Sequence, residues 1–395
     1  MNEGMESQVQ VQVPVLRAVP GQPEAVAFLE RAAARPHHAY LFAGPEGSGK
    51  QLAARAFAAA LLCHRGGCGE CRDCRLALED RHPNVAVVEP EGRDIRVGQG
   101  PDDYGTARWL VARAALTPVE AGRKVFRIEE ADRMTEEAAD VMLKAVEEPS
   151  GDAVFLLSSA RPHELPETIL SRCQTVAFRP LAEGFVVETL MGEGVDERRA
   201  RLTARLAGGN LGRARRMARD PEGLAFRDAA LDALRVAATG APGALDAADR
   251  LAGEAAGYRK RLAGRLDDEL APYVDPETGR PFEEMRALVR RVKERHQRAE
   301  RRAERDFLDW SLLALEAWFR DTLLAAAGGD RDWAINLDLP AGEVDAARAA
   351  AAIEALEAAR ADLADETNLN VRLILEQAFL SLSEAAPAVA TIARE

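Results

Sequence analysis

The sequence predicts an α/β domain with a parallel sheet, followed by a small helical domain and a larger one that is entirely helical. Up to about residue 180 of the 395, short apolar segments alternate with segments of helical periodicity. Such alternation is typical of a parallel sheet covered by helices on both faces. After Pro180 the strand-like segments stop, and Ala, Leu, Arg and Glu favour helices.

The strands follow from short runs of apolar and β-branched residues, and the helices between them from apolar residues that recur on one face. GQPEAVAFLERAAA (21–34) is the first such helix. In the segment 135–148, the Thr135 hydroxyl is positioned to cap the first turn. The predicted strands are HAYLFA (38–43), NVAVVEP (84–90), RKVFRIEE (123–130), DAVFLLSS (152–159) and QTVAF (174–178).

Four regions are expected along the chain. The first residues lack apolar periodicity and suggest a loose tail, whereas the segment that closes in AGGNLGRARRMA has the character of a small helical unit. The predicted regions are a tail (1–17), the sheet domain (18–180), the small helical domain (181–221) and the all-helical domain (222–395).

The net charge of the chain is negative, so its surface as a whole should not attract nucleic acid or an anionic membrane. The formal net charge is −13, and no run of 18 apolar residues could cross a bilayer. The polar, acidic start MNEGMESQVQ is unlike a signal peptide. We therefore expect a cytoplasmic protein with no membrane partner, in which any DNA contact is local or shared with other chains.

The segment LFAGPEGSGKQ (41–51) has the spacing of a phosphate-binding loop, with a strand before it and a helix after it. Such a loop uses glycines to turn N–H groups inward, a helix start to favour anions, and a lysine for the outer phosphates. However, Gln51 stands where a Ser or Thr hydroxyl would hold Mg²⁺. The candidate nucleotide-binding residues here are Gly44, Gly47, Gly49, Lys50 and Gln51.

An acidic pair, Glu129 and Glu130, ends the strand KVFRI, where P-loop ATPases place an Asp for the metal and an acid that positions water. Glu129 is one methylene longer than that Asp. Because this position and Gln51 are both altered, we expect Mg²⁺ and hydrolysis to suffer more than ATP binding.

Four cysteines lie within a dozen residues in the pattern C-x4-C-x2-C-x2-C. In a reducing compartment this crowding favours a metal over disulfides, and four thiolates close a structural zinc site. A redox pair and an iron–sulfur cluster are the alternatives. The expected Zn²⁺ ligands are Cys63, Cys68, Cys71 and Cys74, while Cys173 stands apart as a small buried residue.

The segment 285–305 is locally basic, with nine Arg or Lys against three Glu. Because the Glu residues recur at helical spacing, a solvated, self-paired helix is favoured over a DNA-binding face.

Taken in order, these segments resemble the clamp-loader AAA+ family of bacterial replication, and within it the delta prime branch of DNA polymerase III. The resemblance spans residues 18–220 and is carried by GQPEAV, HAYLFAGPEGSGK, the cysteine insert, ALTPVEAGRKVFRIEEADRM, VMLKAVEEP, FLLSSARPHELPETILSRC and GGNLGRA. A weaker similarity, NLNVRLILEQAFLSL (368–382), is to the last collar helix of that family.

The resemblance implies further roles. In the SRC motif, which is Ser171, Arg172 and Cys173, the arginine would be a finger that enters the nucleotide site of a neighbouring subunit. Ser158 or Ser159 would be the polar sensor at the end of the fourth strand, or else a hydroxyl capping the next segment. Arg213 matches the second sensor, although Arg215 and Arg216 leave its register open. The small helical domain would be a lid and the last domain a collar.

The function implied is that of a stator in the clamp loader of the DNA polymerase III holoenzyme, a nucleotidyltransferase, with little or no ATPase activity of its own. Its partners would be the motor ATPase subunits and the delta subunit, with the sliding clamp and primed DNA reached through the assembly. A motor ATPase that still holds Mg²⁺ through water, and a zinc-containing DNA-binding protein, are the alternatives.

Overall fold

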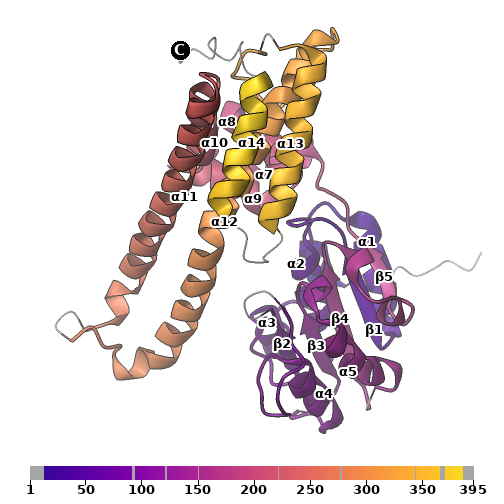
Figure 1. Ribbon diagram of the computed structural model, residues 1–395. Helices are drawn as coiled ribbons and strands as arrows, with labels where there is room; N and C mark the ends of the chain where they lie inside the picture. The colour runs from indigo at the N-terminus through magenta and orange to yellow at the C-terminus, as the bar shows by residue number, and fades with distance from the viewer. Residues whose placement is uncertain are drawn as a thin grey trace, which may run out of the picture. The chain divides into compact units, whose positions relative to one another are not determined.

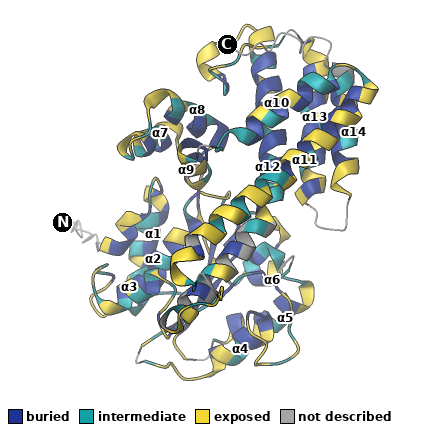
Figure 2. Ribbon diagram, turned by 90° about the vertical axis from the view of Figure 1, so that its left-hand side faces the viewer, coloured by how far each residue is buried: buried dark blue, intermediate teal, exposed yellow. Residues whose placement is uncertain are grey.

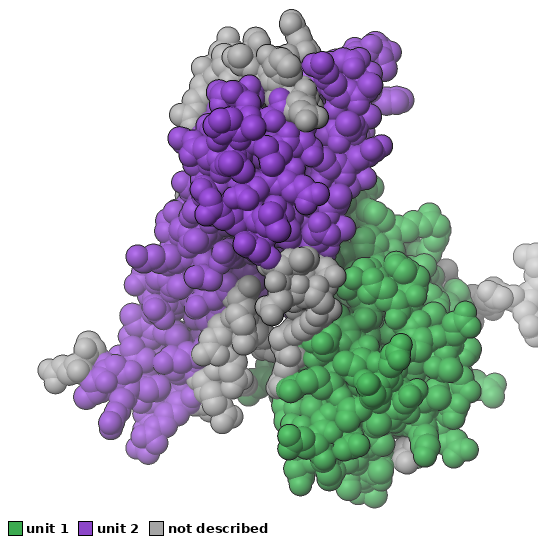
Figure 3. Space-filling view, viewed as in Figure 1, with its two compact units in different colours: residues 1–189, 207–213 green, residues 190–206, 214–395 purple. Residues whose placement is uncertain are grey.

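The computed structural model divides into two compact units, coloured green and purple in Figure 3: residues 1–189 with 207–213, and residues 190–206 with 214–395. The division runs through the segment predicted as a small helical domain. The structure describes residues 13–90, 94–120, 122–149, 151–220, 222–275, 278–342, 344–364 and 370–385.

The prediction of a loose N-terminal tail (1–17) is wrong for residues 13–17, the part of it that the structure describes. Residues 1–12 lie outside the described residues, but Pro14–Ala18 forms a 3-10 helix (η1) whose Val15 and Leu16 are buried. The Val15 N–H donates to the Gly67 carbonyl, 3.0 Å away, within the cysteine insert. Alternating apolar residues in this stretch supply the buried contacts that a loose tail would lack.

All five predicted strands are present and form one parallel sheet, in the order β2-β3-β4-β1-β5 (Figure 1). The order places the end of β1 beside the end of β4, since Ala43 pairs with Ser159, and the ends of β3 and β4 are likewise neighbours. The strands are β1 (Ala39–Ala43), β2 (Val85–Val88), β3 (Lys124–Ile128), β4 (Ala153–Ser159) and β5 (Gln174–Ala177).

Helices cover both faces of the sheet, as the alternation of strands and helices predicted. Tyr40 and Phe42 of β1 belong to one core, and Leu41 between them belongs to the other, because successive strand residues point to opposite faces. One core receives α1 (Pro23–Ala34), α2 (Lys50–Leu62) and α3 (Arg72–Leu78); the other receives α4 (Ala107–Ala115), α5 (Glu136–Glu147) and α6 (Glu167–Leu170).

The capping prediction for α5 is confirmed: the Thr135 hydroxyl accepts the Ala138 N–H at 3.2 Å. The predicted apolar face of this helix is also buried. Three short helices then follow β5, namely α7 (Glu183–Gly192), α8 (Glu197–Ala207) and α9 (Leu211–Arg219).

Beyond α9, the described residues of the second unit form helices joined by turns and loops, and they contain one isolated bridge, between Val274 and Pro281. Its helices each turn a buried stripe toward their neighbours and an exposed stripe outward (Figure 2). The long helices α11 and α12 run side by side as a hairpin (Figure 1). The helices are α10 (Ala225–Ala237), α11 (Ala241–Leu270), α12 (Arg286–Ala326), α13 (Ala346–Ala364) and α14 (Val371–Ala385).

The basic segment 285–305 lies within this hairpin, almost entirely in α12. Its Glu304 pairs with Arg259 of α11, with the Nη1 and Oε2 atoms 2.7 Å apart. That pair is of the kind expected for a solvated helix whose charges are partly balanced.

In the part of the chain that the structure describes, no helix is long and apolar enough to cross a membrane.

Candidate functional site

The phosphate loop lies between β1 and α2, at the carboxyl end of the sheet, where open α/β sheets bind their ligands. Its three glycines all have positive φ, of 153°, 70° and 95° for Gly44, Gly47 and Gly49. A Cβ on Gly44 would lie 2.2 Å from the Phe178 carbonyl oxygen, and one on Gly47 would lie 2.0 Å from the Asn210 side chain. The loop therefore requires glycine at both positions for space as well as conformation.

Lys50 is the first residue of α2 and is buried, whereas Gln51 after it is exposed. The Lys50 ammonium donates to the carbonyl oxygens of Gly44 and, at 2.7 Å, Pro45. Burial lowers the pKa of Lys50, and nearby carboxylates led by Glu46 and Asp132 oppose that shift. This lysine is held inside the loop, with acids around it.

Glu129 is buried at the end of β3, but its carboxylate is already engaged by its own chain. One oxygen accepts the Ser158 hydroxyl at 2.8 Å, and the other pairs with the guanidinium of Arg127. Arg127 is 1% exposed and lies two residues earlier on β3, so both side chains leave the same face of the strand. A guanidinium thus supplies the positive charge beside the acid that stands where P-loop ATPases place an Asp for the metal.

The Arg127 guanidinium also links this acid to the neighbourhood of the cysteines. Its other terminal nitrogen pairs with Asp80, which follows α3 with a left-handed φ of 56°. Asp80 in turn accepts from Nε of Arg55 on α2 at 2.8 Å. The resulting row of alternating charges runs from α2 across the end of α3 to the end of β3.

We predict that Arg127→Leu destabilises the first unit by about 3–5 kcal/mol, because it leaves Glu129 buried without its cation. The matched control is Arg55→Leu at the exposed end of the row, where the side chain is 38% accessible. Its expected cost is about 1 kcal/mol or less. Urea unfolding measures both, and equal losses in the two variants would contradict the assignment.

The second predicted acid, Glu130, has a φ of 48°, a conformation that costs energy in residues other than glycine and is common at functional sites. Its carboxylate pairs with Arg133 at 3.1 Å. Nearby, the Asp132 side chain is only 4% exposed and lies 3.3 Å from Arg161. Among the described residues, the groups of three or more acids, histidines and cysteines that could share a metal all lie around the cysteine insert, away from this loop.

The two serines at the end of β4 have different roles in the structure. Ser158 donates to Glu129 as described, whereas the Ser159 hydroxyl accepts the Arg161 N–H at 3.0 Å and so caps the next segment. Ser158 is therefore the one placed beside the acidic pair.

Arg213 lies in α9, where its N–H donates to the Asn210 side chain that packs on Gly47. The segment that carries Arg213 thus reaches the phosphate loop. Arg215 and Arg216 are engaged within the second unit, by Glu193 and by the Trp310 ring respectively. These contacts favour Arg213 for the second sensor, a role that stays a prediction.

Arg172 follows α6 and is half-exposed, with 36% of its side chain accessible. It pairs with Glu147 at the end of α5 and donates to the Thr168 carbonyl at 2.8 Å. Cys173 beside it packs against the core, and burial raises the pKa of its thiol to about 12, which keeps it protonated.

The four clustered cysteines converge. The sulfur of Cys63 lies 3.7 Å from those of Cys68 and Cys71, and the sulfurs of Cys68 and Cys74 are 4.0 Å apart. Four sulfurs about 2.3 Å from a tetrahedral zinc are separated by about 3.8 Å, so the cluster has the size that zinc requires.

Backbone N–H groups favour the thiolate form of Cys68, whereas burial raises the pKa of Cys74 and disfavours its thiolate. The N–H groups of Glu70 and Cys71 lower the pKa of Cys68 to about 6. The Gly69 N–H points at the Cys74 sulfur, 3.3 Å away. The spacing of the four sulfurs fits a structural zinc ion, which would bind them as thiolates and hold α3 against α2.

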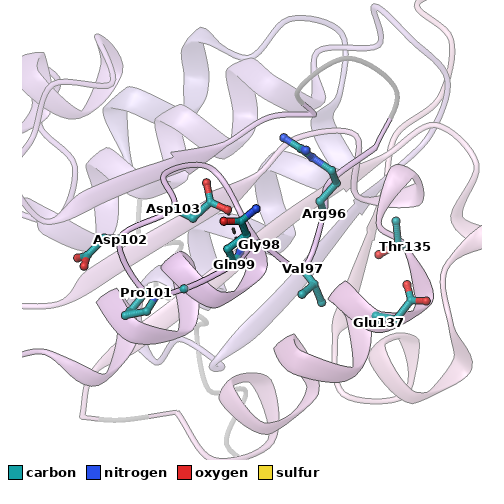
Figure 4. Close-up of a pocket in the computed structure, with 10 residues that line it drawn as sticks. Arg96, Val97, Gly98, Gln99, Pro101, Asp102, Asp103, Thr135 and Glu137 are labelled. Carbon is teal, nitrogen blue, oxygen red and sulfur yellow. Dashed lines mark hydrogen bonds between the residues drawn. The ribbon is translucent and has the colours of Figure 1, made fainter.

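A separate open pocket of about 950 Å³ lies beside the loop 96–103, next to the start of α5 (Figure 4). The Asp103 carboxylate accepts the Gln99 N–H at 2.9 Å and fixes the loop. None of the predicted nucleotide-binding residues lines it.

Sequence reasoning missed Arg127, Asp80, Asn210 and Glu147. The signal for Arg127 was present, because it is a charged residue between Phe126 and Ile128 in a mostly apolar strand, two positions before the acid it pairs with. Asp80 and Asn210 gave no such signal, since their partners lie far away in sequence.

Comparison with known proteins shows what this chain is similar to. The family described as DNA polymerase III, delta subunit, matches residues 21–182. The delta' subunit of Bacillus subtilis is 35% identical over 188 residues, which cover 47% of this chain and 55% of the relative. The delta' subunit of Pseudomonas aeruginosa is 46% identical over 142 residues, covering 34% and 41%.

The tau subunit of Bacillus subtilis is 32% identical over 154 residues, which are 38% of this chain and 26% of the relative. A gamma subunit-related protein of Thermotoga maritima is similar in structure with a TM-score of 0.41 at 17% identity, covering 91% of this chain and 99% of that one. The chain spans about half the length of the delta' relatives it matches.

The strand order, the phosphate loop, the cysteine insert and the SRC segment all lie within or beside the matched region. Residues 21–182 thus match the family described as DNA polymerase III, delta subunit, and this part of the chain is similar in sequence to delta' subunits of that polymerase.

Proposed function

We propose that this chain is a stator of the clamp loader, a subunit that triggers ATP hydrolysis in its neighbour and hydrolyses little or none itself. The observation that carries the proposal is the state of the acid at the end of β3. Glu129 is shared between Arg127 and Ser158, and Gln51 offers no hydroxyl to a metal. Hydrolysis needs a cation that neutralises charge developing on the phosphates, and Mg²⁺ normally supplies it.

Arg172, the proposed arginine finger, is well suited to act on another chain. Arg172 is half-exposed, and an arginine stays positively charged. A fixed positive charge is what stabilises the negative charge that develops on the phosphates during hydrolysis. We infer that Arg172 enters the nucleotide site of an adjacent motor subunit. The residues Gly44, Gly47, Gly49, Lys50, Glu130 and Arg213 would at most hold a nucleotide without turning it over.

The rest of the chain has supporting roles in this proposal. A structural Zn²⁺ on the four cysteines would stabilise the first unit. Residues 181–221 would act as the lid, and 222–395 as the collar through which the motor and delta subunits assemble. The sliding clamp and primed DNA would be reached through that assembly in the cytoplasm.

A motor ATPase is the second candidate, because Lys50 and the loop glycines are intact. We predict that a loader reconstituted with Lys50→Ala turns over ATP within about twofold of wild type, since this lysine serves no hydrolytic step. Phosphate release in the presence of clamp and primed DNA is the measurement. A loss of tenfold or more would favour the motor and reject the stator.

A further inference from the structure

The guanidinium of Arg172 is held by three groups of its own chain. Nη1 donates to the Thr168 carbonyl at 2.8 Å and to the Ser171 hydroxyl at 3.1 Å. Nη2 forms an ion pair with Glu147. Arg172 is the cation that the proposed function directs at a neighbouring subunit. In this structure its Nη2 atom is neutralised by the Glu147 carboxylate of its own chain.

Helix stability does not account for Glu147. It is the last residue of α5, where the partial negative charge of the helix end disfavours an acid. The side chain is 36% exposed, so it adds little to the core. Its ion pair with Arg172 is the favourable contact that the structure gives this carboxylate.

We propose that Glu147 is the resting partner of Arg172, and that its carboxylate gives way to the γ-phosphate of a nucleotide held by the adjacent subunit. This inference rests on the proposed function. The contacts to Thr168 and Ser171 keep Nη1 in place, while Nη2 changes partner. Glu147 is then a positioning residue that sets how readily the finger leaves its own chain.

The chemistry of the two anions favours this exchange. A γ-phosphate carries more charge than a carboxylate and offers three acceptor oxygens to the planar fork of an arginine. An exposed ion pair contributes at most about fivefold to an equilibrium constant. Glu147 can therefore hold the finger without preventing its release.

The sign of the expected effect follows from this competition. Glu147→Gln keeps the shape of the side chain but removes its charge, so Arg172 becomes easier to detach. Affinity for the ATP-bound form of the neighbour should rise, by about two- to fivefold. Affinity for the ADP-bound form should not change, because that form offers no γ-phosphate.

Glu148 provides a matched control. It is the next residue, it is exposed, and among the described contacts its carboxylate has no ion pair. Glu148→Gln removes the same charge from the same helix end without touching Arg172, so it should behave as wild type.

The experiment measures binding of the full-length labelled chain to a loader lacking this subunit, with a non-hydrolysable ATP analogue or with ADP. Wild type, Glu147→Gln, Glu148→Gln and Arg172→Ala are compared. We expect tighter binding only for Glu147→Gln and only with the ATP analogue, and maximal ATP turnover of the complete loader should equal that of wild type. The double variant Glu147→Gln with Arg172→Ala should lose the gain.

Three outcomes would overturn the inference: Glu147→Gln binding like Glu148→Gln, binding more weakly, or lowering maximal turnover. The last would mean that Glu147 orients the finger for the reaction instead of restraining it. Arg172→Ala separates this failure from failure of the stator: if it binds and turns over as wild type, the proposed function itself is wrong. If Arg172→Ala is defective while Glu147→Gln is silent, only the role of Glu147 is rejected.

Discussion

Replacing Arg172 by alanine should lower ATP hydrolysis at the adjoining motor site by about 10³-fold or more and abolish clamp loading, while the loader still assembles. An arginine finger supplied in trans contributes about 10³–10⁵ to the rate of phosphoryl transfer. Because the Arg172 side chain is half-exposed and makes its described polar contacts at α6 and at the end of α5, its loss should leave the fold intact. Steady-state phosphate release by the reconstituted loader, with clamp and primed DNA, is the measurement.

Two controls define this result. Arg172→Lys keeps the charge but loses the planar fork, so we expect partial activity well below wild type. Arg31→Ala removes an exposed arginine on α1, far along the sequence from the SRC segment, and should have no effect. Full activity of an assembled Arg172→Ala loader would contradict the trans role.

Replacing Cys74 by serine should remove one zinc ion per chain and lower the unfolding midpoint of the first unit by about 10 °C or more. Cys74 is fully buried, and its sulfur lies 3.9 Å from the Ala59 carbonyl of α2. A structural zinc contributes its binding free energy to folding. Each kcal/mol lost shifts the midpoint of a domain of this size by about 2–4 °C.

Cys173→Ser is the control for that prediction. This thiol packs against the core on the other face of the sheet and stays protonated, so its replacement should leave the zinc content at one per chain. Metal analysis and a thermal scan give both quantities. Purified wild-type chain without zinc, or Cys74→Ser with its full complement, would reject the structural metal site.

The sheet was predictable because its signals are local. Each strand is a short apolar run, each glycine of the phosphate loop is needed for its own backbone conformation, and the four cysteines are close in sequence. Patterns of this kind depend on the neighbours within one turn or one strand, so they can be recognised without the tertiary structure.

The charge arrangement at the site was not predictable in the same way. Glu129 was expected at the nucleotide site as an altered form of the metal-binding Asp, and its pairing with Arg127 was not predicted, although the sequence already placed Arg127 on the same side of β3. Whether two such residues pair depends on what else fills the space, and Asp80 and Arg55 arrive there from α3 and α2. The N-terminal segment was misjudged for a similar reason, because Val15 and Leu16 are buried by the distant cysteine insert and α2.

The most direct test of the stator compares Lys50→Ala and Arg172→Ala in the same reconstituted loader, by ATP turnover with clamp and primed DNA. Our account predicts that turnover survives the loss of Lys50 and is lost with Arg172, because this chain supplies a cation to its neighbour and no hydrolytic site of its own. Loss of turnover with Lys50→Ala, or normal turnover of an assembled Arg172→Ala loader, would contradict it.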